Sequence, residues 1–529
     1  MATALPMWSI TRAARFAPSN IIVTTSASRQ ALTSFRPHAT WRVIGGLRMA
    51  STVSDTAVVA TQGETSGQKE RVVILGSGWA GYAFARTLDP RKYERIMISP
   101  RSYFVFTPLV ASTAVGTLEF RAVIESVRRL NLDHFYQGWA DDVDFGRKVV
   151  RVEANTSDDV AGRTRAQLAP ASGKLEIEKG PMFDVPYDKL VIAVGAYAQT
   201  FGIEGVKDYA NFLRNVGDAR RVRIKILQCF EKASLPITTD EEKRKLLHFA
   251  IVGGGPTGIE FAAELHDLIE DDLRKTYPEL HQFIKITVYD VAPKVLPMFD
   301  QKLAQYAMDT FKRERIDVKT EHHLTRIRPD DDCAGCLKLR FKEYGEEEVG
   351  AGIVVWSTGL MQNPLIRKLE SKAGEQQLQK DAKTGGLVSD AHLRVLAVPK
   401  SAAEKAEQQE QDVTVVPGVY SIGDCAVVAG QRYPATAQVA SQQATYLAKS
   451  FNKGNLEAKP FRFRNWGVMT YLGSWRAIHQ SSADELTGRA AWFLWRTAYL
   501  TKSMSVRNKI MVPLYWLVSW IFGRDISRF

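Results

Sequence analysis

The sequence has few cysteines and no long hydrophobic run. Its 529 residues include four cysteines, too few for a disulfide framework in a chain of this length. No stretch reaches the roughly 18 consecutive apolar residues that a membrane-spanning helix requires. The longest apolar run, 510–523, contains Pro513. The nine histidines are scattered without the spacing of metal ligands, so we expect no metal site.

Acidic residues are absent from residues 1–54. This segment contains six arginines, no lysine, and many serine, threonine and alanine residues. The composition is typical of a mitochondrial transit peptide, and a disordered basic tail is the alternative. We expect the transit peptide over residues 1–52 and a polar linker over residues 53–69. Without the six arginines the net charge of +12 falls to about +6, which is too small to indicate a nucleic acid partner.

Cys333 and Cys336 form a CxxC pattern directly after three aspartates. No second pair and no histidine stands at zinc spacing from them, and they do not follow a strand that opens a helix, where a redox pair is expected. We therefore predict a hairpin loop at this position.

Residues 71–81, RVVILGSGWAG, are the first strong motif. They predict a buried strand at 72–75, a turn containing Gly76, Gly78 and Gly81, and a helix that begins near Tyr82. Glycines at this spacing allow a tight turn, a close approach of the backbone to a pyrophosphate, and close packing of helix on strand. The helix N-terminus then faces the negative charge. One such copy is a weak signal, because the pattern also occurs in ordinary turns.

A second copy of the pattern strengthens the interpretation. The strand 248–252 leads into Gly253, Gly255 and Gly258, and a helix is expected at 259–269. The next strand ends in Asp290, which lies farther from Gly258 than the usual separation of about 20 residues because the charged segment 270–280 intervenes. A carboxylate at this strand end suits the ribose of NADH and would repel the 2′-phosphate of NADPH. A solvated turn residue is the alternative.

The first unit lacks the corresponding acid. Its second strand ends in Ser99, and Arg101 follows two residues later. An arginine here suits either the 2′-phosphate of NADPH or the surroundings of a flavin dinucleotide, and its position does not distinguish the two.

Later strands indicate that the chain returns to the first unit after the second. Two strands end in small residues at Gly195 and Gly359, and the run 415–425 places Asp424 after a glycine at a strand end. This order predicts an α/β fold with two Rossmann-like units, as in two-dinucleotide flavoproteins of the glutathione reductase type. In that arrangement the first unit holds FAD, for which a hydroxyl at Ser99 suffices.

The chain beyond Phe461 has a different character. It holds six of the eleven tryptophans, with arginines and lysines interleaved among them. Apolar faces with aromatic and basic edges favour a bilayer interface. A dimer interface and an ordinary core are the alternatives, since each would bury the same face.

These features divide the chain into consecutive segments. After the linker we predict the first part of the FAD-binding domain at 70–237, the NADH-binding domain at 238–365, the second part of the FAD-binding domain at 366–459, and a membrane-anchoring or dimerisation region at 460–529.

Five motifs together carry a family resemblance. The runs GSGWAG, SPRSYFVFTPL, IVGGGPTGIEFAAEL, SIGDCA and PATAQVASQQA resemble those of type II NADH:quinone oxidoreductases, the single-chain alternative NADH dehydrogenases. The similarity covers residues 70–529 and is closest to the fungal mitochondrial branch.

The resemblance implies a flavoenzyme that does not pump protons. It would pass two electrons from NADH through non-covalently bound FAD to ubiquinone, as a peripheral protein and homodimer at the mitochondrial inner membrane. No apolar run follows the transit region and no calcium-binding loop is present. We therefore expect the matrix face rather than the intermembrane-space face.

The resemblance also assigns roles to individual residues. Those for FAD are Gly76, Gly78, Gly81, Ser99, Thr107, Gly195, Asp424 on the ribityl chain, and Gln438. Those for NADH are Gly253, Gly255, Gly258, Glu260, Asp290 and Gly359. Those for quinone are Gln438, Gln442, Trp495 and Tyr499, and the catalytic candidates are Glu260, Gln438 and Gln442. Ser441 stands where the family often has histidine.

Two other functions compete with this interpretation. A sulfide:quinone or disulfide reductase of the same fold needs a redox cysteine pair beside the flavin, and only Cys425 is expected near it. The second alternative is a mitochondrial flavoprotein that binds NADH as a signal.

Overall fold

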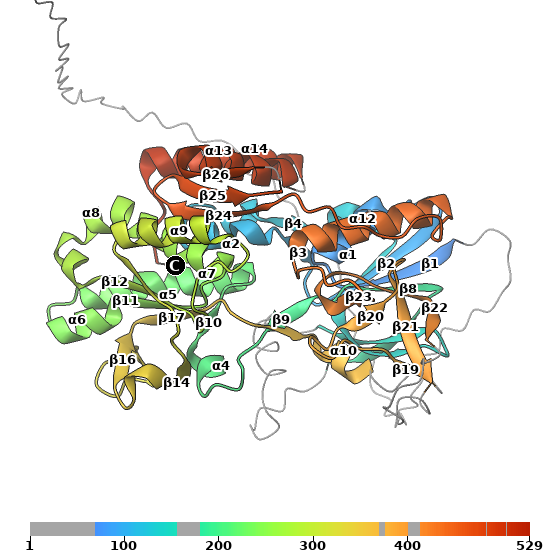
Figure 1. The fold of residues 1–529 in the computed structure, drawn as a ribbon, viewed down its shortest axis with the longest axis horizontal. Helices are drawn as coiled ribbons and strands as arrows, with labels where there is room; N and C mark the ends of the chain where they lie inside the picture. Colours follow the sequence, from blue (N-terminus) through green and yellow to red (C-terminus); the bar gives the residue numbers. More distant parts are fainter. Residues whose placement is uncertain are drawn as a thin grey trace, which may run out of the picture. The chain divides into compact units, whose positions relative to one another are not determined.

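The computed structural model describes residues 69–155, 180–369, 376–399, 413–482, 484–503 and 505–528 (Figure 1). The expected transit peptide lies outside these residues, as does the expected linker except for Lys69. The described chain is organised around two separate sheets, one mixed with a parallel centre and one parallel, and a C-terminal region.

The first sheet has five adjacent parallel strands at its centre. Their order is β22 (Thr414–Ser421), β8 (Lys189–Ile192), β1 (Glu70–Leu75), β2 (Tyr93–Ser99) and β5 (His134–Asp144). Because β22 follows the second sheet in sequence and yet pairs with β8, the chain returns to its first unit. The predicted two-unit α/β fold is confirmed.

Antiparallel strands extend this sheet on both sides. They are β6 (Val149–Ala154), β7 (Met182–Pro186), β19 (Gln376–Leu378), β20 (Leu387–Ser389), β21 (Arg394–Pro399) and, pairing parallel with β20, β23 (Ala426–Val428). The helices α1 (Trp79–Thr87) and α12 (Ala437–Lys453) pack against each other, with the rings of Phe84 and Phe451 edge to face at 5.6 Å. Helix α1 begins at Trp79 rather than near Tyr82, because extended Gly78 is its N-cap and Gly81 lies within its first turn.

The second sheet is parallel throughout. Its order is β10 (Asn211–Phe212), β17 (Ile353–Trp356), β11 (His248–Val252), β12 (Lys285–Tyr289) and β13 (Ile316–Lys319). Its helices include α5 (Val216–Ala233), α6 (Asp240–Leu246), α7 (Pro256–Leu268) and α9 (Gln301–Arg313). Strand β10 joins this sheet before residue 238, so the chain enters the second unit earlier than the segment boundary drawn from the sequence.

Helix α7 begins at Pro256, three residues before the predicted start. Proline at the first helical position costs little, because its missing N–H would have no partner inside the helix. The charged segment after α7 forms a π-helical turn at Ile269–Leu273 and the short helices α8 (Arg274–Thr276) and η5 (Pro278–Phe283). This insertion accounts for the long interval between Gly258 and Asp290.

A two-stranded ribbon connects the two units. Strand β9 (Ala196–Ala198) leaves the first sheet and pairs antiparallel with β18 (Leu360–Gln362), where the chain returns. A separate antiparallel sheet is inserted into the second unit between β13 and β17, with strands β14 (Leu324–Pro329), β15 (Leu337–Phe341) and β16 (Glu348–Ala351). The CxxC pattern lies in the loop between β14 and β15, as predicted, and its two cysteines are disulfide-bonded.

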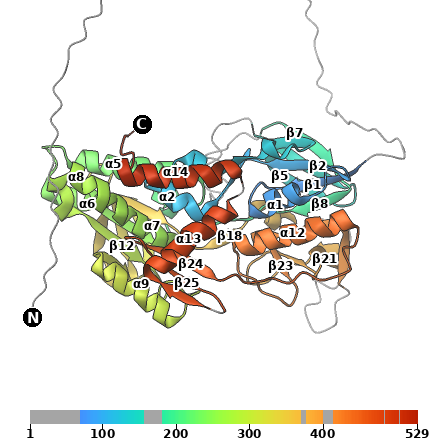
Figure 2. The same ribbon diagram turned by 90° about the horizontal axis from the view of Figure 1, so that it is seen from above.

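The C-terminal region combines a small sheet with two helices. The sheet consists of β24 (Val468–Gly473), β25 (Arg476–Gln480) and β26 (Glu485–Thr487), with β24 against α7. Helices α13 (Gly488–Lys502) and α14 (Val506–Phe522) lie outermost on this side (Figures 1 and 2). Among the described helices, none combines the length and the apolar character needed to cross a bilayer.

A partly buried arginine anchors the end of this region. The Arg524 guanidinium donates hydrogen bonds to Asp272 Oδ2 at 2.7 Å and to Thr117 Oγ1 at 2.9 Å. Thr117 in turn donates to the buried carboxylate of Glu264 at 2.8 Å. The residues after α14 are therefore tied to both dinucleotide-binding units.

Candidate functional site

The first glycine turn is closely packed at Gly81 and open at Gly78. A Cβ atom on Gly81 would lie 1.9 Å from the carbonyl oxygen of Gly76. A Cβ atom on Gly78 would meet nothing within 4 Å. The helix N-terminus at Gly78 has no side-chain cap and no acidic residue in its first turn. Its amides therefore face open space in which an anion can bind.

The second turn repeats this geometry. A Cβ atom on Gly258 would lie 1.9 Å from the carbonyl oxygen of Gly253, whereas one on Gly255 would meet nothing within 4 Å. The N-terminus of α7 likewise lacks a side-chain cap and an acid in its first turn. Both turns thus leave space at the position where a dinucleotide pyrophosphate approaches the backbone.

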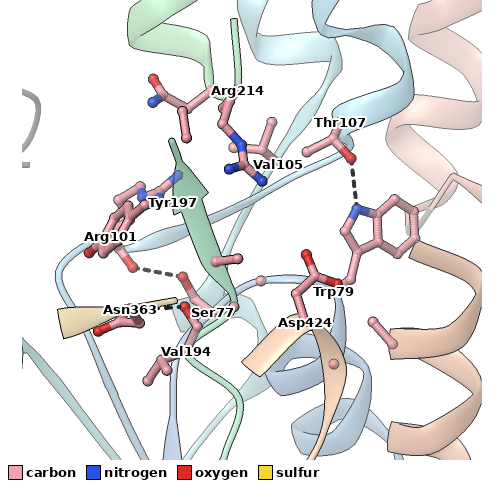
Figure 3. A pocket seen from close by; sticks show the side chains of 18 of the residues that line it. Ser77, Trp79, Arg101, Val105, Thr107, Val194, Tyr197, Arg214, Asn363 and Asp424 are labelled. Carbon is pink, nitrogen blue, oxygen red and sulfur yellow. Dashed lines mark hydrogen bonds between the residues drawn. The ribbon is translucent and has the colours of Figure 1, made fainter. Parts of the chain in front are cut away.

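One cavity of about 1380 Å³ connects the two units with the C-terminal region. From the first unit it is lined by Gly76, Gly78, Ser99, Thr107, Gly195 and Asp424, among others. From the second unit it is lined by Pro256, Thr257, Glu260 and Gly359, and from the C-terminal region by Met469 and Tyr499. Figure 3 shows part of this cavity, with Asp424, Trp79 and Thr107 on one side and Arg214 facing them.

Ser99 and Thr107 are held by neighbouring side chains. The Ser99 hydroxyl lies 2.9 Å from the Ser77 hydroxyl and accepts a hydrogen bond from the backbone N–H of Arg101. The Thr107 hydroxyl accepts from Trp79 Nε1 at 2.9 Å. In the aromatic loop around Thr107, Phe104 and Phe106 are buried, while Tyr103 and Val105 line the cavity. The loop therefore contributes to the core and to the cavity wall.

The turn that carries Asp424 is fixed by a residue that sequence reasoning missed. The buried side chain of Gln443 accepts a hydrogen bond from the backbone N–H of Gly423 at 2.7 Å. Burial raises the pKa of Asp424, and the Arg214 charge opposes this rise. The helical spacing of Gln443 from buried Val439 and Leu447 is the sequence signal that could have placed it on the inner face of α12.

Asp290 lies beside the second glycine turn. One of its carboxylate oxygens accepts a hydrogen bond from the backbone N–H of Gly254, and the other accepts from Ala292 N at 2.7 Å. Neither Asp290 nor Gly253, Gly255 and Gly258 is among the residues that line the cavity. The carboxylate is therefore oriented by the turn itself, outside the shared cavity.

Glu260 is buried on α7 where the second unit meets the C-terminal region. Its Oε1 accepts hydrogen bonds from the backbone N–H of Tyr471 at 3.2 Å and from Trp495 Nε1 at 3.3 Å. Burial raises the pKa of Glu260 to about 8, although these two hydrogen bonds favour the carboxylate. Close to neutral pH the side chain is therefore mainly a neutral acid on the cavity wall.

Two of the four residues expected at a quinone site, Gln438 and Gln442, form side-chain hydrogen bonds with the backbone of a neighbouring loop. Gln438 donates to Gly467 O at 2.7 Å, and Gln442 donates to Arg464 O at 2.8 Å; each also accepts a backbone N–H from the same loop. Neither lines the cavity. Both amides therefore fasten α12 to the chain that leads into β24.

The other two expected quinone residues lie near Glu260. Tyr499 lines the cavity, and its ring lies 5.0 Å from that of buried Trp495 and 6.1 Å from that of Phe106. Burial and the neighbouring Glu260 raise the pKa of Tyr499. Sequence reasoning missed Tyr471 and Arg214, which belong to no motif and reach their places only through tertiary packing.

Comparisons with known proteins identify the family. Residues 70–444 match the pyridine nucleotide-disulphide oxidoreductase family, and residues 466–525 match the NDH2 C-terminal domain. The internal alternative NAD(P)H-ubiquinone oxidoreductase A1 of Solanum tuberosum is 34% identical, over 89% of this chain and 90% of that protein. The external alternative NADH-ubiquinone oxidoreductase of Yarrowia lipolytica is 33% identical, over 87% and 81%. The structure of NDH2 from Plasmodium falciparum in complex with NADH has 25% identity and a TM-score of 0.72, covering 87% of this chain and 100% of that one.

The chain belongs to the pyridine nucleotide-disulphide oxidoreductase family. Within that class it is a type II NADH:quinone oxidoreductase, a flavoenzyme that uses FAD and NADH, as the sequence motifs predicted. The residues fit FAD, since Gly78 leaves space at an uncapped helix N-terminus. The alternative of a disulfide-type reductase finds no support, because no cysteine lines the cavity in the part of the chain that the structure describes.

Substitutions at two glycines of the first turn should have different effects. In Gly78→Val the new side chain enters open space, so we expect a folded protein that lacks flavin. In Gly81→Val the Cβ atom overlaps the Gly76 carbonyl, so we expect loss of the fold. Flavin absorbance and thermal unfolding of the purified variants check this. A Gly78→Val protein with a full complement of flavin would contradict the assignment of this turn.

Glu260 should make stability depend on pH. Its folded pKa lies above the unfolded value, so the native state binds more protons between about pH 4.5 and about pH 8. Stability should therefore fall as pH rises through this window, by up to about 1.4 kcal/mol per pH unit from this group. Urea unfolding should show a shallower fall for Glu260→Gln, whereas Glu346→Gln at an exposed position is the matched control. If the unfolding free energies of Glu260→Gln and the wild type changed equally with pH, the prediction that Glu260 is a buried neutral acid would be refuted.

Proposed function

We propose that this enzyme reduces ubiquinone with electrons from NADH at the surface of the mitochondrial inner membrane. The single observation that carries the proposal is the cavity that joins the first glycine turn, the N-terminus of α7 and Tyr499. Bound FAD supplies a carrier that takes up two electrons as a hydride and gives them to the quinone. The overall reaction takes NADH, one proton and quinone to NAD⁺ and quinol.

The residues of the cavity contribute binding and orientation. The α1 and α7 N-termini place the two dinucleotides on opposite sides of the shared space. Glu260 is the proposed proton donor to the quinone, because its carboxyl group is neutral near pH 7 and lines the same cavity as Tyr499. Gln438 and Gln442 are proposed to position the loop at 464–467 rather than to bind quinone directly.

Asp290 supports a preference for NADH over NADPH. Its carboxylate is fixed beside Gly254 in the turn that the nucleotide approaches. A 2′-phosphate at this position would be repelled by the negative charge.

The outer surface of α14 supports binding to a membrane. Ile510, Leu514, Leu517 and Ile521 are exposed at helical spacing, and they form one apolar stripe. Beside it Arg496 stacks on the rings of Trp492 and Trp516, and Lys502 lies over Trp466. Cations above interfacial tryptophans suit the headgroup layer of a bilayer. The same stripe is also proposed as the homodimer interface.

The face of the membrane is a separate proposal. The relatives include enzymes named as internal and enzymes named as external. We favour the matrix face because the sequence shows neither a calcium-binding loop nor an apolar run after the transit region.

Quinone dependence tests the proposed reaction. The purified holoenzyme should oxidise NADH slowly alone and rapidly when a short-chain ubiquinone is added, and kcat/KM should be lower for NADPH. Fast oxidation without quinone, or equal rates with an added disulfide as acceptor, would contradict the proposal. The signalling alternative predicts binding of NADH without turnover under any of these conditions.

Polar substitutions on the stripe should weaken membrane binding. The triple change of Leu514, Leu517 and Ile521 to serine removes apolar surface worth about 1 kcal/mol per side chain, so binding to liposomes should fall roughly 100-fold. The matched control changes exposed Leu235, Ile237 and Val413 to serine. Co-sedimentation at the wild-type level would refute the membrane proposal, and conversion of a dimer to a monomer would assign the stripe to dimerisation.

A further inference from the structure

The charged residues that line the cavity fall into two groups. Eight are present: Arg101, Asp141, Arg214, Asp218, Arg221, Glu260, Lys368 and Asp424. Lys368 pairs with Asp141 at 2.8 Å, Arg221 pairs with Asp218, and Glu260 accepts the two hydrogen bonds described above. Arg101, Arg214 and Asp424 remain without an ion-pair partner within 4 Å among the described residues.

The backbone of Arg214 is fixed by a hydrogen bond at the start of α5. It lies between β10 and α5, where its N–H donates to Asp218 Oδ2 at 3.0 Å and the next residue, Asn215, caps the helix. Its side chain is free to extend, and Figure 3 shows the guanidinium directed into the cavity, with Arg101 and Tyr197 on one side and Asp424 facing it. Nη1 is buried and has no hydrogen-bond partner in the part of the chain that the structure describes.

This arrangement is costly unless an acceptor enters the cavity. Burial lowers the pKa of Arg214, the charge of Asp424 raises it, and the charge of Arg101 lowers it again. The Arg214 and Arg101 charges repel each other, and although Asp424 and Asp218 act on Arg214 through space, no described carboxylate pairs with either guanidinium within 4 Å. An anion that entered between the two arginines would relieve this repulsion. A guanidinium offers a planar fork of donors that matches phosphate oxygens.

We propose that Arg214, assisted by Arg101, binds the diphosphate of FAD from the side opposite the glycine turn. The two positive charges match the two charges of a diphosphate. The amides at the N-terminus of α1 contact it from one side. Arg214, in the upper part of the view in Figure 3, and Arg101, at its left, contact it from the other sides. Asp424 then lies beyond the phosphates, toward the ribityl chain, where a carboxylate accepts hydroxyl protons without opposing an anion. This assignment rests on FAD as the cofactor.

Release of flavin from the purified holoenzyme tests the proposal. Dilution followed by flavin fluorescence gives the dissociation constant of FAD. We expect Arg214→Met to raise the dissociation constant of FAD at least tenfold. Arg214→Lys keeps the charge but loses the planar fork of donors, so its dissociation constant should lie between those of the wild type and Arg214→Met. The midpoint potential of the flavin that stays bound should equal that of the wild type, because the arginine contacts phosphate and not the ring. Arg274→Met, at an exposed position on α8, is the matched control.

The following results would overturn the assignment of Arg214 to the FAD diphosphate. Unchanged affinity for FAD with a shifted midpoint potential would place Arg214 at the flavin ring. Unchanged affinity for FAD with a raised KM for NADH would place it at the second dinucleotide. Should Arg214→Met fail to fold, Arg101→Met must show the same weakened binding at unchanged potential, or the proposal fails. A wild-type protein that does not retain FAD would instead refute the cofactor assignment itself.

Discussion

The structure depends on two places where backbone touches backbone. At Gly81 and at Gly258 the helix lies so close to the preceding turn that a single Cβ atom would overlap a glycine carbonyl. This approach puts the N-termini of α1 and α7 at the carboxyl edges of their sheets, where uncapped amides attract phosphate. The ribbon of β9 and β18 then joins the two units, so that both edges contribute to one cavity.

The C-terminal region completes this cavity and also alters its chemistry. Strand β24 and helix α13 cover α7, and Tyr471 and Trp495 supply the two donors that Glu260 accepts. The same covering removes water, which raises the pKa of Glu260. Arg524 ties the end of the region to Asp272 and Thr117. The C-terminal region that presents an apolar stripe on α14 therefore also sets, through β24 and α13, the protonation of an acid in the interior.

Local patterns sufficed to predict the fold because its main features are local. Glycine spacing, strand length and the order of the motifs determine a strand–turn–helix unit without reference to distant residues, and Asp424 indicated the chain's return. Helix starts were placed three residues late, since an extended glycine N-cap or a leading proline is not visible in hydrophobic periodicity. Gln438 and Gln442 illustrate the limit for sites. Their helix was predicted, but the backbone loop that their amides bind comes from a segment more than twenty residues away.

Arg214 shows why the ion-pair partners of charged residues could not be predicted from the sequence alone. Its neighbours in sequence include Asp218 and Arg221, and any of these three residues could have formed a surface ion pair. In the fold, Arg221 neutralises Asp218, and the Asp218 carboxylate also binds the backbone of Arg214. The Arg214 guanidinium is thereby left without a local partner and extends into the cavity. A buried charge of this kind is tolerated where a ligand of opposite charge completes it, so unpaired cations in a cavity with paired neighbours indicate where an anion binds.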